Sequence, residues 1–130
     1  MILRIPRRLE SPNTWQGRHW RYKQQLTRVW EQEIAYVALP ATGCLWIARP
    51  VPTTRMLVTV ERDVPSRRNF IRDDDNLRFA VKPLLDALKR QCLIRDDSRR
   101  WIVLPTPTQH VSEDGKDWTV IRITPMRRVR

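Results

Sequence analysis

The sequence predicts a small α+β domain, with a mixed sheet of about four strands and two main helices. Short segments of alternating apolar residues, which are typical of strands, flank two longer segments whose apolar residues recur every three or four positions, as in helices. Strands and helices that follow one another in this way pack as a sheet with helices against it. Because the chain has 130 residues, of which 41% are hydrophobic, we expect residues 1–130 to form a single domain.

The first half of the chain is predicted to contain a short strand, a long helix and a longer strand. The predicted elements are a strand at 2–5, a turn at 11–13, a helix at 16–39, a loop at 40–53 with a short extended piece at 46–47, and a strand at 54–62. Pro40 is expected to end the helix, because proline lacks the backbone donor that a helix interior needs. The strand at 54–62 shows the clearest alternation, with Met56, Val58 and Val60 on one face.

The second half is predicted to begin with a helix that starts at an acidic cluster. Asp75 is the expected N-cap, since carboxylates stabilise helix N-termini. Pro83 stands inside the helical pattern, so a kink or a fresh start is expected near Lys82 and Pro83. Two strands, at 101–104 and 118–123, complete the sheet, with a turn at 113–116 before the second.

The charge of the chain is strongly basic, yet its acidic residues are clustered. The formal net charge is +11, but five of the 14 acidic residues stand in two short runs, Asp73-Asp74-Asp75 and Asp96-Asp97. Neighbouring carboxylates repel one another unless a cation lies among them, and oxygen ligands suit Mg²⁺ or Mn²⁺. A basic chain favours a polyanionic partner such as nucleic acid. Together these features indicate a metal-dependent nuclease.

The two acidic runs contain the candidate catalytic residues. If residues 73–75 are extended, Asp73 and Asp75 point to one side, and with Asp97 they would supply ligands for one or two Mg²⁺ ions. Lys82 would then neutralise charge that develops on the phosphate or on the leaving oxygen. The alternative is that the first run is only a solvated helix start and the second only a turn.

Four motifs in this order resemble the core of the RusA family of Holliday junction resolvases. They are an acidic D-x-D-N element, a lysine, a D-x-L helix segment and a later D-D pair, here within 72–77, 82–88 and 94–97. The resemblance covers about residues 67–103. Ser11-Pro12-Asn13 is similar to an early element of the same family.

This resemblance implies a RusA-like nuclease domain that acts as a homodimer on four-way DNA junctions, often in phages and prophages. It implies that Asp73, Asp75 and Asp97 bind the metal and that Lys82 is the catalytic lysine. Lys82 lies three residues later than in the shortest family form, where Phe79 stands here. A straight helix over 76–91 would be about 24 Å long, so Asp97 either returns along it or comes from the partner subunit.

Basic residues near these motifs are predicted to contact DNA. Arginines beside the acidic run would clamp phosphates, and basic and aromatic residues interleave at 18–23, where Trp20 would stack on an unpaired base. The predicted DNA-binding residues are Arg18, Arg21, Lys23, Arg67, Arg68 and Arg72.

The basic charge of the chain is also compatible with functions other than a nuclease. A non-catalytic DNA-binding protein on the same scaffold, or a basic RNA-binding module, would also explain the charge. No apolar run approaches the ~20 residues of a membrane-spanning helix, and Cys44 and Cys92 lack metal-binding spacing. We therefore expect reduced thiols and a cytoplasmic protein of a bacterial or phage-infected cell.

Overall fold

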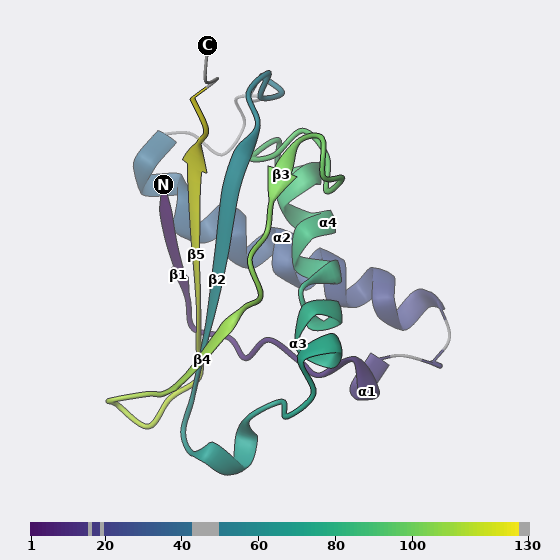
Figure 1. Cartoon of the computed structure of the whole chain (residues 1–130), viewed down its shortest axis with the longest axis vertical. Helices are drawn as coiled ribbons and strands as arrows, with labels where there is room; N and C mark the ends of the chain where they lie inside the picture. The colour runs from purple at the N-terminus through teal and green to yellow at the C-terminus, as the bar shows by residue number, and fades with distance from the viewer. Residues whose placement is uncertain (16, 19, 43–49, 128–130) are drawn as a thin grey trace.

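The computed structural model describes residues 1–15, 17–18, 20–42 and 50–127, and has helices packed against one face of a mixed sheet (Figure 1). In chain order the elements are β1 (Ile2–Ile5), α1 (Pro12–Trp15), α2 (Trp20–Thr42), β2 (Met56–Val64), the 3₁₀ helix η1 (Arg67–Asn69), α3 (Asp74–Ala80), α4 (Lys82–Arg90), β3 (Ile102–Val103), β4 (Thr108–Val111) and β5 (Trp118–Pro125). The predicted α+β class is confirmed.

The sheet is built around β2, its longest strand. The strand order is β1-β5-β2-β3, and β4 also pairs with β2. β5 runs antiparallel to β1 and β2, whereas β3 and β4 run parallel to β2 and follow one another along its other edge. The start of β2 therefore lies beside β3, and its end lies beside β4.

The core lies between the sheet and two helices. Alternate residues of β2, among them Val58 and Val60, are buried toward α2 and α4. Trp30 and Ile34 of α2 and Leu88 of α4 are almost completely buried in the same core. The other face of the sheet is more open, and Ile2 there keeps 65% of its surface exposed. Among the described residues, no helix is long and apolar enough to cross a membrane.

The long strand and the helix break agree well with prediction. β2 is shifted two residues along the chain, and α3 ends before α4 begins at Lys82, as the position of Pro83 indicates. Pro83 stands in the first turn of α4, where its missing N–H would have no helical partner in any case.

Several boundaries differ from those predicted. Residues 12–15 form the short helix α1, not a turn, and Gly17 with its φ of +80° separates α1 from α2. α2 continues for two residues beyond Pro40. Proline lacks a backbone N–H, but because Pro40 stands in the last turn only one hydrogen bond near the end of the helix is lost. β4 was not predicted, because its residues lack a buried alternating face. The extended piece expected at 46–47 lies outside the described residues.

Candidate functional site

The acidic run Asp73-Asp74-Asp75 forms the start of α3. Asp73 is the N-cap, in an extended conformation, and its Oδ1 accepts a hydrogen bond of 2.9 Å from the Asp75 backbone N–H. Asp74 and Asp75 occupy the first helical turn, where negative charge is favoured by the helix dipole. The predicted cap is therefore wrong, since the cap is Asp73 and not Asp75, and the condition that residues 73–75 are all extended is not met because α3 begins at Asp74.

Asp73 and Asp75 have different surroundings as a result. Asp73 lines an open groove, whereas the side chain of Asp75 is 87% exposed and lies 3.7 Å from Arg78 one turn along α3. Such an exposed pair contributes little to stability. The carboxylate of Asp75 is therefore accessible to a ligand at small energetic cost.

The groove beside Asp73, which we call the α1–α3 groove, combines two distant parts of the sequence. It has a volume of about 830 Å³. Ser11 and Asn13 line it from the N-terminal segment, and Asp73 and Asn76 line it from α3. These are residues of the early S-P-N element and of the D-x-D-N element, about 60 positions apart, so the fold brings these two motifs to one surface.

A buried arginine holds the backbone around this groove. Arg62 of β2 is only 3% exposed, and its guanidinium donates to the carbonyl oxygens of Leu9 (2.7 Å) and Asn69 (2.6 Å) and to Oε1 of Gln109 (3.1 Å). Burial, with a contribution from nearby Arg8, lowers the pKa of Arg62 to about 10. The guanidinium therefore stays charged at neutral pH and links the N-terminal segment, η1 and β4.

Gln109 completes this link by bonding the segment that leads into Asp73. Its Oε1 accepts from the Ile71 backbone N–H at 2.9 Å, and its Nε2 donates to the Ile71 carbonyl at 2.8 Å. One side chain thus satisfies both backbone groups of Ile71, as a neighbouring strand would. We call Arg62 and Gln109 the groove clamp. Sequence reasoning missed both, although Arg62 shares the buried face of β2 with Val60 and Val64.

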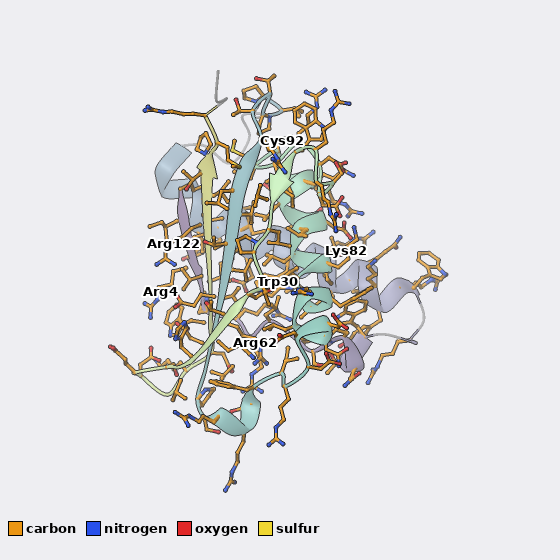
Figure 2. The ribbon with its side chains drawn as sticks, in the orientation of Figure 1. Arg4, Trp30, Arg62, Lys82, Cys92 and Arg122 are labelled. Carbon is orange, nitrogen blue, oxygen red and sulfur yellow. The ribbon has the colours of Figure 1, made fainter. Side chains whose placement is uncertain are left out.

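Lys82, the first residue of α4, lies beside Asp97. Its Nζ donates a hydrogen bond to Asp97 Oδ2 and lies 3.3 Å from Asp86 Oδ1, one turn further along α4. The hydrogen bond to Asp97 raises the pKa of Lys82, and Asp86 acts in the same direction. The side chain of Lys82 is therefore protonated and positively charged at neutral pH. Figure 2 shows Lys82 on α4.

The return of the chain after α4 explains how Asp97 reaches Lys82. Cys92 adopts a positive φ of 56° just after α4 ends, and Leu93 and Ile94 are buried against the core. This reversal sends the chain back along α4, where Lys89 lies 3.1 Å from Asp96. Bonds from Lys89 and Ser98 lower the pKa of Asp96 to about 2. Asp97 thus meets the lysine of its own chain.

The three predicted metal ligands are not assembled around one point. Asp73 and Asp75 stand at the start of α3, whereas Asp97 lies beside Lys82 at the start of α4. Within the described ranges, no group of three or more His, Cys, Asp or Glu side chains is placed to hold a metal ion. The donor types suit Mg²⁺, but Asp97 would have to move to join the other two.

Two of the six predicted DNA-binding residues line the α1–α3 groove, and the other four lie on η1 and α2. Arg18 and Arg72 line the groove itself, and Arg67 and Arg68 are exposed on η1. Arg21 and Lys23 are on the first turns of α2, with Arg21 5.6 Å from the Trp20 ring centroid and Lys23 5.9 Å from that of Trp15.

A scan against protein-family models and a search of curated proteins each found no match to this chain.

Proposed function

We propose that this chain is a metal-dependent endonuclease of the RusA type, which cuts four-way junctions or other branched DNA. The observation that carries the proposal is that motifs distant in the sequence lie next to one another in the structure, two at a time. Ser11 and Asn13 share a groove with Asp73 and Asn76, and Lys82 contacts Asp97. A shared active site would bring these motifs, which are far apart in the sequence, to one surface in this way.

The chemistry proposed for the acidic residues depends on a divalent cation. Asp73, Asp75 and Asp97 would hold Mg²⁺ or Mn²⁺, which when bound would polarise the scissile phosphate and lower the pKa of a coordinated water. Asp97 would have to part from Lys82 to share an ion with the other two carboxylates. The proposal therefore includes a rearrangement of the Lys82–Asp97 pair when DNA and metal bind.

Lys82 supplies positive charge. While it is bonded to Asp97, its raised pKa keeps it protonated at neutral pH. A lysine released from Asp97 would instead stabilise the negative charge that builds on the phosphate in the transition state. The exposed Arg67 and Arg68, with Arg72, Arg18, Arg21 and Lys23 around the α1–α3 groove, would bind the DNA backbone.

Paired cleavage requires two active sites. A four-way junction is cut at two symmetry-related phosphates, and one chain offers one set of carboxylates, so we propose a two-fold homodimer. Its place of action would be the cytoplasm of a bacterial or phage-infected cell.

The experiment is incubation of the protein with a synthetic four-way junction and Mg²⁺, beside a linear duplex of the same sequence. We expect paired cuts in the junction alone, with Asp73→Asn, Asp75→Asn and Asp97→Asn each inactive while still binding the junction. Asp74→Asn is the matched control, because it removes the same charge from the same run of aspartates. Cleavage at the native rate by Asp75→Asn would overturn the assignment.

The second candidate is a DNA-binding protein without catalytic activity. The observation that favours it is that Lys82 pairs with Asp97, so that the charge of this carboxylate is already balanced within the protein. This function predicts that the junction is bound but left intact with Mg²⁺ or Mn²⁺. It also predicts that Asp75→Asn and Asp74→Asn change affinity equally, since only net charge would matter.

A further inference from the structure

A second open groove lies at the opposite end of the sheet from the α1–α3 groove. It has a volume of about 1020 Å³ and is lined by residues 53–55, 100–101 and 125–127. Backbone hydrogen bonds join these segments, from Met56 N–H to the Trp101 carbonyl (2.9 Å) and from Met126 N–H to the Arg55 carbonyl (2.8 Å). In Figure 1 this end carries β3 and the end of β5. We call it the distal groove.

The lining of the distal groove is basic. Arg55, Arg100 and Arg127 line it, and within the described part of the chain no acidic residue does, whereas Glu10, Asp73 and Asp117 line the α1–α3 groove. Among the ion pairs between described residues, none joins these three arginines to a carboxylate. Their charge is thus available to an anionic partner.

Contacts within the protein restrict the guanidinium groups here. The Arg55 guanidinium donates to the Arg99 carbonyl at 2.7 Å. Arg95 and Arg100 stack on the Trp101 ring, at 4.5 and 5.4 Å from its centroid. A stacked arginine keeps its N–H donors at the edge of its plane and has less conformational entropy to lose on binding. Guanidinium groups restricted in this way favour binding of a row of regularly spaced phosphate groups over diffuse attraction of mobile anions.

The loop that carries Asp97 also forms one wall of this groove. Asp97 contacts Lys82, while Arg100 and Trp101 line the groove three and four residues later. Three residues span at most about 10 Å, which is the rise of about three nucleotides along a duplex. DNA with a phosphate at Asp97 would therefore have neighbouring phosphates close to the distal groove.

We propose that the distal groove binds the DNA backbone beside the cleavage site, with phosphates held by Arg55, Arg100 and Arg127. The hydroxyl groups of Thr53 and Thr54 line the same groove and add donors for phosphate oxygens. This inference rests on the proposed function, because it assigns the groove to an arm of the same branched DNA.

The test measures binding of a fluorescently labelled four-way junction in EDTA, so that no cleavage occurs, from 50 to 200 mM salt. Arg55→Gln/Arg100→Gln is compared with Arg4→Gln/Arg122→Gln, which lowers net charge equally on the sheet face away from α4 (Figure 2). We expect the first pair to weaken binding about tenfold at 50 mM salt and to flatten the log–log salt slope by about two units. The control pair should change affinity less than about threefold.

Equal losses in both pairs, or no loss in either, would overturn the proposal. If Arg55→Gln/Arg100→Gln melts below the native protein, Arg100→Gln/Arg127→Gln replaces it, since it leaves the Arg55–Arg99 bond intact. Tighter binding of an RNA hairpin through the same arginines would overturn the assignment to DNA.

Cleavage of the same junction in Mg²⁺ separates this inference from the nuclease proposal. Arginine-dependent binding without cleavage would support the distal groove and reject the nuclease. Cleavage by the native protein, with equal losses of binding affinity in the two double variants, would support the nuclease and reject the distal groove. A native protein that binds no DNA would reject both.

Discussion

At the residue scale, the contact between Lys82 and Asp97 is the closest link between two predicted catalytic residues. Asp97 raises the pKa of Lys82, so the folded state holds this proton more tightly than the unfolded chain does. Its stabilising effect should be complete below the unfolded pKa of about 10.4 and should disappear as the pH rises through the higher folded value. Across the neutral range it should be constant.

A double-mutant cycle tests this contact. With Lys82→Met, Asp97→Asn and both together, we expect a coupling of no more than about 1 kcal/mol at pH 8, because the lysine side chain is 40% exposed. Urea denaturation at pH 8 and pH 11.5 measures it. A coupling that stays unchanged at the higher pH would contradict the ion pair.

The groove clamp gives a second prediction at this scale. Gln109→Leu removes the partners of both backbone groups of Ile71 and one acceptor of Arg62, so it should destabilise the protein by about 1–3 kcal/mol. Thr108→Leu, at the exposed neighbouring position in β4, should change stability by less than about 0.5 kcal/mol. Chemical denaturation compares the two, and equal effects would show that Gln109 has no special role.

At the scale of elements, the start of α3 combines a structural role with the proposed chemical one. Asp73 caps the helix, so Asp73→Ala should cost about 1 kcal/mol of stability without any metal present. Asp73→Asn should cost almost nothing, since asparagine caps helices as well as aspartate does. Thermal unfolding in EDTA measures both. Equal loss in the two variants would indicate that the charge of Asp73, not its hydrogen bond, stabilises α3.

At the scale of the whole molecule, the proposed homodimer gives a test of where each site is built. Asp97 lies beside Lys82 of its own chain, which favours a site contained within one subunit. Mixed dimers of Asp75→Asn and Asp97→Asn chains should then stay inactive, because each site carries one defect. Nicking of one strand by the mixture would show that Asp97 acts across the interface.

The oligomeric state itself is checked separately. Light scattering at micromolar concentration should give twice the mass of one chain for the free protein, and that mass plus the mass of the DNA for its complex with a junction. A strictly monomeric protein under both conditions would reject paired cleavage by a dimer, whatever the outcome of the mixing experiment.

Local patterns in the sequence predict the class of the fold and most of its core. The alternation in β2 and the helical spacing in α2 and α4 are local patterns, and burial of one face follows directly from them. The break before α4 could be predicted for the same reason, since Pro83 acts on its own backbone. β4 could not, because its pairing with β2 uses backbone groups, not an apolar pattern.

Which polar side chains meet depends instead on contacts between segments that are distant in the sequence. Arg62 becomes the buried half of the groove clamp because β4 runs parallel to β2 and carries Gln109 to it. Asp97 reaches Lys82 because the chain reverses its direction at Cys92 and the buried residues that follow fix the returning segment against the core. Both contacts join segments that are far apart in the sequence. Such contacts depend on strand register and on where the chain reverses, and local patterns of residues do not predict either.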